Sequence, residues 1–181
     1  MVAYLELRRI NSIQNLLSVD AVKTLVCLPV FSRLDYCNSL LVGLPQYLIK
    51  RLQGVQNAAA RSILRTPRSE HISPLVLNLH WLPVNRRTLH KVAAWCHISL
   101  SVSGPQYLYD LTHVYTLARS LRSSSDTGIL STPNVKLKSY AQRSFAYHGP
   151  TAWNSLPLAL RYQQESDCFK RALKTHLFSL N

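Results

Sequence analysis

Apolar residues recur every three or four positions along most of this 181-residue chain, and proline, glycine or serine separates the runs. This spacing places the apolar side chains on one face of a helix, which can then pack against a core. The runs predict helices near residues 2–17, 20–41, 46–65, 84–101 and 165–179. The sequence therefore predicts a mainly α fold that begins as a helical bundle.

Several of the expected helix ends carry the residues that usually cap or stop a helix. Ser18 offers an N-cap for the second helix, and Glu165 with its neighbours offers one for the last. Thr66-Pro67 stops the third helix, because proline cannot donate the next backbone hydrogen bond. Pro83 suits the first turn of the fourth helix.

Composition predicts one internal boundary, at the serine-rich stretch 119–128, which we interpret as a linker. The preceding residues, 1–118, are expected to form a helical domain. The residues after it, 129–181, are expected to form a small α+β C-terminal segment. Short alternating runs at 128–133 and 143–148 predict a β-hairpin there, followed by a helical turn and the terminal helix.

The chain is strongly basic: 21 Lys and Arg stand against eight Asp and Glu, for a net charge of +13. A polyanion is the natural partner of such a chain. Arginine is twice as frequent as lysine, and its guanidinium fork matches phosphate oxygens. This favours a nucleic acid over a lipid surface.

The basic residues fall into clusters that we interpret as candidate phosphate contacts, with an ordinary solvated surface as the alternative for any single cluster. On the third helix one face carries, at steps of three and four residues, the stripe Lys50, Gly54, Asn57, Arg61 and Arg65. The full set is Lys50, Arg61, Arg65, Arg68, Arg86, Arg87, Lys91, Lys136, Lys138, Arg143, Lys170, Arg171 and Lys174.

Residues for catalysis, metal binding and cofactor binding do not form a recognisable set. The acids are isolated except for Glu165 and Asp167, which stand where helix caps belong. His90 and His97 lie seven helical residues apart, about 10 Å, which is too far to share one zinc ion. Phosphate-binding glycine loops and nucleophile motifs are missing as well. We therefore expect no enzymatic activity of the chain alone, no metal and no cofactor.

The cellular setting is expected to be the nucleus or the cytoplasm. No uninterrupted apolar stretch reaches the length of a membrane span, and the first residues lack the pattern of a secretory signal. The four cysteines are widely spaced, which is typical of reduced thiols in a core rather than of a disulfide framework. No membrane partner is expected.

Several short sequence blocks, taken in their order along nearly the whole chain, resemble those of one protein family. The blocks are Ile13–Leu25, Ser32–Asn38, Leu52–Arg61, His71–Leu75, Leu79–Val84, Arg119–Ser123, Ala152–Pro157 and Phe169–Leu177. Together they are similar to the thumb and C-terminal region of the reverse transcriptase of non-LTR (LINE-type) retrotransposons. That family is an RNA-directed DNA polymerase, and its palm and endonuclease are absent from this chain. The resemblance implies a thumb-like bundle in which residues 46–68 and 83–101 contact the template–primer phosphates.

Two functions remain open on this basis. The first is a non-catalytic, nucleic-acid-binding fragment of such a reverse transcriptase, whose partners are RNA, DNA or an RNA–DNA hybrid, with the palm supplied by a longer protein. The second is a decayed or domesticated fragment that serves as a protein-interaction module or has no function.

Overall fold

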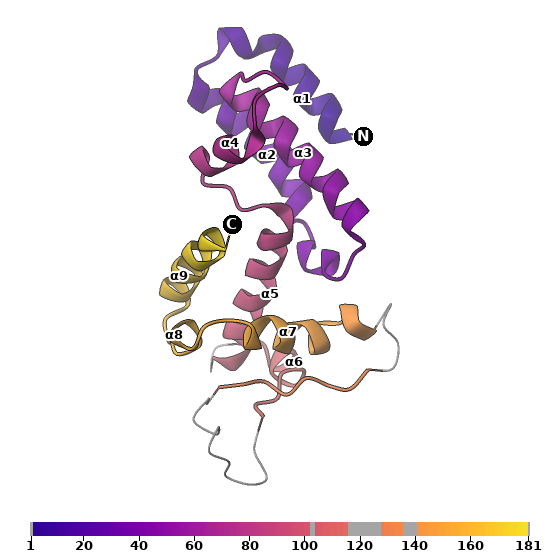
Figure 1. The fold of residues 1–181 in the computed structure, drawn as a ribbon, viewed down its shortest axis with the longest axis vertical. Helices are drawn as coiled ribbons and strands as arrows, with labels where there is room; N and C mark the ends of the chain where they lie inside the picture. Colours follow the sequence, from indigo (N-terminus) through magenta and orange to yellow (C-terminus); the bar gives the residue numbers. More distant parts are fainter. Residues whose placement is uncertain (1, 102–103, 116–127, 136–140, 181) are drawn as a thin grey trace. The chain divides into compact units, whose positions relative to one another are not determined.

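The computed structural model describes residues 2–101, 104–115, 128–135 and 141–180. The described residues are mainly helical, which confirms the expected fold class (Figure 1). The chain divides into two compact units, Met1–Arg87 and Thr88–Asn181. Each unit is described by itself below.

The first unit is a bundle in which α1, α2 and α3 pack on one another and α4 packs on α3. Its elements are α1 (Val2–Ile13), η1 (Gln14–Leu16), α2 (Val19–Asp35), η2 (Asn38–Leu41), α3 (Gln46–Leu64) and α4 (Ile72–Asn78), with the start of α5 (Val84–Leu100). Ser18 caps α2 as expected, since its hydroxyl accepts a hydrogen bond from the Ala21 amide at 3.3 Å. The chain turns sharply after α2, where Cys37 adopts a left-handed conformation with φ 51°.

The core of the first unit comes from apolar stripes at helical spacing. Val22, Val26 and Val30 of α2 are buried at intervals of four residues. The apolar periodicity that predicts a helix at 46–65 brings Ala59 and Ile63 of α3 into the core, where they are buried. The remaining buried members are Leu7, Ile10, Leu34, Ala60, Val76, Leu79 and Trp81. Burial of this kind is the main source of stability in such a bundle.

Two glutamines of α3 hold the extended segment that leads into α5. Gln56 is completely buried, and its Nε2 donates to the Leu82 carbonyl at 2.8 Å. One turn earlier, Gln53 Oε1 accepts from the Val84 amide at 2.9 Å. These side chains satisfy backbone groups at the point where the extended segment passes into α5.

The second unit surrounds the larger part of α5 with short helices. Its other elements are α6 (Gln106–Tyr109), η3 (Ala141–Arg143), α7 (Phe145–Asn154), α8 (Leu158–Arg161) and α9 (Ser166–Ser179). Phe169 of α9 is buried and stacks on His97 of α5, with ring centroids 4.3 Å apart. Trp153 of α7 lies 5.7 Å from Phe169, so the three rings form the centre of this unit.

The end of α7 holds the backbone of Leu130, whose neighbours Ile129 and Ser131 pair with Tyr115 and His113. Asn154 accepts from the Leu130 amide at 2.9 Å and donates to the Leu130 carbonyl at 2.8 Å, as a neighbouring strand would. Next to it, the indole of Trp153 donates to the Gly128 carbonyl at 2.8 Å. The side chain of Leu130 is thereby held in the core, where it is buried.

The predicted β-hairpin is not found in the described residues. Its second strand, 143–148, is wrong because Phe145–Asn154 is an α-helix, and only an isolated bridge between Val114 and Leu130 represents extended pairing there. The reason is burial at helical spacing: Gly149, Ala152 and Trp153 face the core of the unit. A run of six residues is too short to separate the two periods.

Two further differences concern boundaries. The second helix ends at Asp35 rather than near 41, and a helix that was not predicted, α4, lies between α3 and α5. The predicted serine-rich linker lies outside the described residues except for its last residue, and it stays a prediction. The division that the structure does show, between Arg87 and Thr88, falls inside the predicted first domain.

Candidate nucleic-acid interface

The C-terminal end of α3 brings three of the candidate arginines to one pocket. Arg61, Arg65 and Arg68 line a cavity of about 460 Å³ in the first unit. The other lining residues come from the same end of α3 and from α1 and η1, and they are Asn11, Gln14, Ala58, Ser62, Thr66 and Pro67. We call this cavity the arginine pocket.

Two of these arginines are fixed by backbone carbonyls. Arg61 donates to the carbonyls of Pro67 and Glu70, the second at 2.7 Å, and so closes the loop that follows α3. Arg65 donates to the carbonyl of Gln14 at 2.6 Å and to that of Leu17 at 3.3 Å. Cations near a helix C-terminus also interact favourably with its dipole. Both side chains therefore belong to the architecture of the first unit.

Arg65 holds this position in an unfavourable backbone conformation. It is the C-cap of α3, with φ 53° in the left-handed region that glycine usually fills. A non-glycine residue there costs about 1–2 kcal/mol. The two carbonyl contacts of its guanidinium offset part of that cost.

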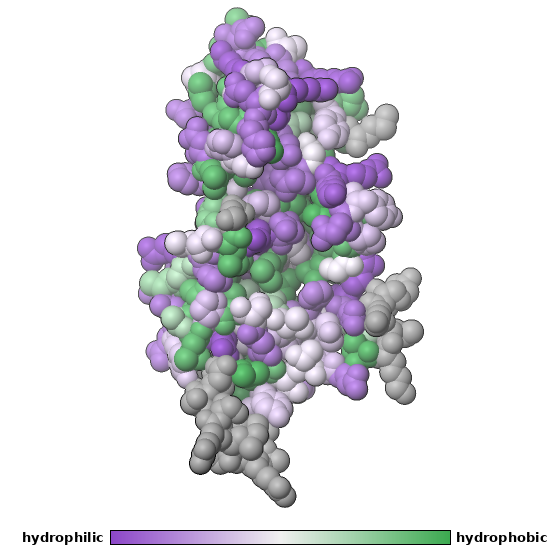
Figure 2. Space-filling view, in the orientation of Figure 1, coloured by the Kyte–Doolittle hydropathy of each residue, from purple (hydrophilic) through white to green (hydrophobic). Residues whose placement is uncertain are grey.

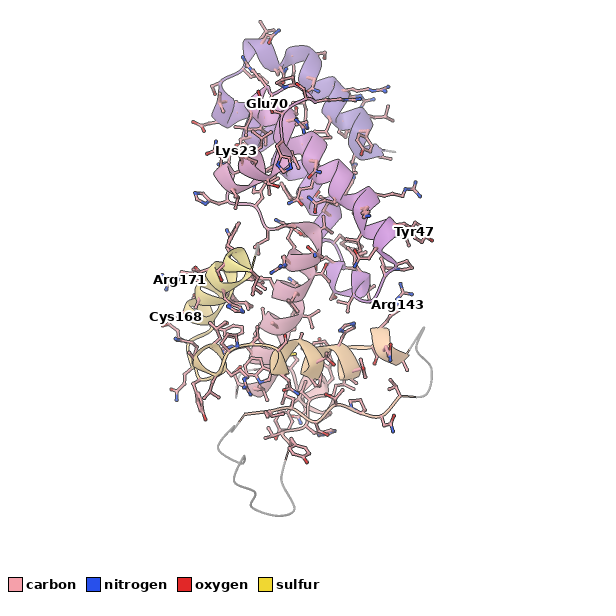
Figure 3. All side chains as sticks on the ribbon, viewed as in Figure 1. Lys23, Tyr47, Glu70, Arg143, Cys168 and Arg171 are labelled. Atoms are coloured by element: carbon pink, nitrogen blue, oxygen red, sulfur yellow. The ribbon has the colours of Figure 1, made fainter. Side chains whose placement is uncertain are left out.

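The positive charge of the arginine pocket is not neutralised by the residues that line it. None of them is an acid. The nearest acid along the loop is Glu70, labelled in Figure 3, whose backbone carbonyl accepts from Arg61. Carbonyl oxygens orient a guanidinium without cancelling its charge, so an anion in the pocket would meet cations already in place.

Polar groups of the pocket wall are incompletely paired. The side-chain oxygens Oε1 of Gln14 and Oγ1 of Thr66 are buried and have no hydrogen-bond partner among the described residues. Across the pocket, Ser62 donates its hydroxyl to the Asn11 side chain. A buried polar atom without a partner costs free energy, which a suitably placed ligand group can recover.

The predicted stripe along α3 is only partly open. Lys50 is exposed at its start. At Gly54, however, an added Cβ would lie 3.3 Å from the hydroxyl of Tyr4, so α1 covers the middle of the stripe. Asn57 accepts a hydrogen bond from Gln53 at 2.8 Å. An approaching phosphate backbone would therefore meet the two ends of the stripe, not its whole length.

Arg87 is the candidate whose charge is most fully compensated in the first unit. Its Nε donates to Asp35 at 2.9 Å, a second guanidinium nitrogen contacts the other carboxylate oxygen, and the group lies 4.4 Å from the centre of the Phe31 ring. Phe31 in turn packs edge-on against Trp81. The predicted phosphate contact at Arg87 thus competes with a structural ion pair.

The candidates of the second unit are distributed over α5 and α9. Lys170 pairs with Asp167 at 3.3 Å, and Lys174 lies over the Phe178 ring at 5.9 Å. Arg171 is exposed on the outer side of α9, as Figure 3 shows. On α5, Lys91 lies 5.5 Å from the centre of the Trp95 ring. Such contacts are typical of cations on a solvated surface.

Four of the predicted phosphate-contacting residues remain, and they form no second cluster of cations in the described part of the chain. Arg86 is half-buried at the start of α5, and Arg143 is half-buried in η3. Lys136 and Lys138 lie outside the described residues. The arginine pocket is thus the best-defined grouping of the predicted residues.

The residues that sequence reasoning missed come from far away along the chain. Asn11 and Gln14 join the arginine pocket from α1 and η1, roughly fifty positions before the arginines. No local pattern marks them as partners of α3. The sequence marks Thr66 only as part of a helix stop, and the structure places it in the wall of the pocket.

Side chains that could bind a metal ion are scattered over the described part of the chain. Within those residues no three His, Cys, Asp or Glu side chains lie close enough to hold a metal ion. Burial raises the pKa of the Cys96 thiol to about 12, so this thiol stays protonated at neutral pH. Among the described helices, none has the length and apolarity needed to cross a bilayer.

Comparison with known protein families, with curated proteins and with solved structures finds no match for this chain.

Proposed function

We propose that the chain is a nucleic-acid-binding fragment that grips phosphates and performs no catalysis of its own, as its resemblance to the thumb and C-terminal region of a LINE-type reverse transcriptase implies. Its partners would be RNA, DNA or an RNA–DNA hybrid in the nucleus or cytoplasm. A palm supplied by a longer protein would complete the polymerase.

The arginine pocket is the observation that carries this proposal. Three arginines line it, and no acid is among the lining residues. Phosphate contacts of this kind give affinity without base specificity. The net charge of +13 adds a long-range attraction for any polyanion.

The experiment is a titration of a fluorescent RNA–DNA hybrid with the full chain across a salt series. Lys50→Gln combined with Arg68→Gln removes two exposed cations and leaves the carbonyl contacts of Arg61 and Arg65 intact. We expect the log–log salt slope to fall by about 1–2 units, since each lost phosphate contact lowers it by about one.

A charge-matched control makes this result specific. Lys23→Gln with Arg33→Gln removes two exposed cations from α2, away from the arginine pocket, and should change the slope little. An equal fall of the salt slope in both variants would indicate only a diffuse electrostatic attraction between the chain and the hybrid. Failure of the unmodified, folded chain to bind the hybrid at low salt would refute the proposal.

A protein-interaction module is the second candidate, and exposed apolar side chains of the first unit favour it. Leu16 is 87% exposed, Leu28 66% and Leu40 69%. Figure 2 shows apolar side chains interspersed with polar ones on the face it draws. Where such side chains form a contiguous patch, the patch often binds another protein. Light scattering combined with the titration distinguishes the two candidates. A chain that self-associates and does not bind the hybrid supports the protein-interaction module.

A further inference from the structure

We infer that the arginine pocket is a receptor for a single phosphate-bearing nucleotide, presented by the end of a nucleic-acid strand or as a free mononucleotide. The inference rests on the proposed function and goes beyond it, because gripping a duplex along its backbone requires no such receptor.

The size of the pocket argues for more than a phosphate ion. Its volume of about 460 Å³ lies within the range of roughly 300–1,000 Å³ that is usual for small-molecule sites. The convex phosphate row of a double helix can contact exposed Arg68 but does not fill a concave site of this size. A strand end or an unpaired nucleotide can enter it.

The charge of the pocket is preorganised for a phosphate. Backbone carbonyls from two different segments hold Arg61 and Arg65 in place, so little side-chain freedom is lost when an anion binds. Each guanidinium has five N–H groups, and these contacts leave several of them for a ligand. Arg68 is exposed and has no hydrogen bond or ion pair among the described residues, so it can close on the anion.

The remaining lining suits the nucleoside part of such a ligand. Ala58 and Pro67 contribute apolar surface, and the planes of the guanidinium groups can stack on a base. The unpaired Oγ1 of Thr66 and the amide of Gln14 can supply hydrogen bonds after a rotamer change. The wall thus combines the cations, the apolar contacts and the unpaired polar groups that a nucleotide uses.

The substitution Thr66→Val tests whether the Thr66 hydroxyl contacts a ligand or only stabilises the fold. Because the Thr66 hydroxyl oxygen has no partner among the described residues, its replacement by a methyl group should leave the unfolding midpoint unchanged or raise it slightly. If the hydroxyl contacts the nucleotide, the same change should weaken nucleotide binding by roughly tenfold. A purely structural role cannot give this combination.

The test is calorimetric titration of the full chain with adenosine monophosphate, adenosine and inorganic phosphate, and with a short DNA strand that carries or lacks terminal phosphates. We expect the monophosphate to bind at least tenfold more tightly than either of its parts, with losses in Thr66→Val and Arg68→Gln but not in the control Arg33→Gln.

The strand ligands distinguish the two sources of the nucleotide. Tighter binding of the phosphorylated strand assigns the pocket to a strand end, while binding of the monophosphate alone assigns it to a free nucleotide, and either result supports the inference. A chain that binds the RNA–DNA hybrid but shows no preference for the monophosphate overturns the inference and leaves the proposed function standing. A chain that binds the monophosphate but not the hybrid supports the nucleotide receptor and refutes the proposed function.

Discussion

The two compact units use their polar side chains in different ways. In the first unit, arginines bind backbone carbonyls and a carboxylate, as Arg61, Arg65 and Arg87 do. In the second unit, the described core centres on stacked rings and on one asparagine that pairs with the backbone. Removing Arg61, Arg65 or Arg87 from the first unit should therefore affect fold and binding together, whereas Lys91, Arg171 and Lys174 of the second unit are exposed on its surface.

The largest expected effect is the loss of the ring cluster in the second unit. Phe169→Ala should lower the free energy of unfolding by about 3–5 kcal/mol, because it leaves a cavity beside His97 and Trp153. Urea unfolding followed by circular dichroism measures the loss, and hydrogen exchange should place it in residues after Thr88. Phe178→Ala, at a half-buried position of α9, is the control and should cost clearly less.

A smaller loss is expected from the asparagine of α7. Asn154→Ala removes two hydrogen bonds to Leu130, each worth about 1 kcal/mol, and leaves buried backbone groups unpaired. We expect the Leu130 amide to exchange much faster and the second unit to lose about 2 kcal/mol. Unchanged exchange at Leu130 would show that Asn154 does not hold this segment.

The first unit should respond differently, because Arg65 combines strained backbone with useful contacts. Both Arg65→Gly and Arg65→Ala lose the contacts to Gln14 and Leu17. Glycine also removes the strain of φ 53°, so the alanine variant should be less stable by about 1 kcal/mol. Paired urea titrations measure the difference, and an alanine variant as stable as the glycine variant would contradict it.

The smallest expected effect is a pH dependence in the second unit. Burial lowers the pKa of the His148 imidazole below its usual value. As the pH falls, the unfolded chain therefore binds this proton at a higher pH than the folded chain does. The contribution of the neutral His148 to folding stability is complete above about pH 6.5 and is lost at lower pH. Unfolding measured from about pH 8 to about pH 5 should show a shallower decline in His148→Gln. Identical slopes in both proteins would assign the decline to other groups.

Sequence reasoning succeeded where the pattern was local and long. The apolar stripe of α3 and the Ser18 cap of α2 could both be read from spacing alone. It failed at 143–148. A run of six residues fits both the strand period and the helix period, and contacts with distant residues determine which structure forms. Gly149 illustrates this, because an added Cβ there would lie 3.0 Å from the Cys96 sulfur of α5.

The candidate site was predictable in the same uneven way. The clustering of Arg61, Arg65 and Arg68 follows from helical spacing and a short loop. The pocket itself does not, because Asn11 and Gln14 reach it only after α1 packs on α3. Nor does spacing reveal that Arg87 is paired with Asp35, 52 positions earlier.

The two glutamines of α3 have a consequence for the order in which the first unit can come apart. The backbone groups of Leu82 and Val84 are held by side chains of Gln56 and Gln53, not by a strand of their own. When α3 unravels, these groups lose their partners at once, and the first turn of α5 must loosen with it. The two segments should therefore open as one cooperative unit, and an amide at residue 84 would report on the survival of a helix that ends twenty residues earlier.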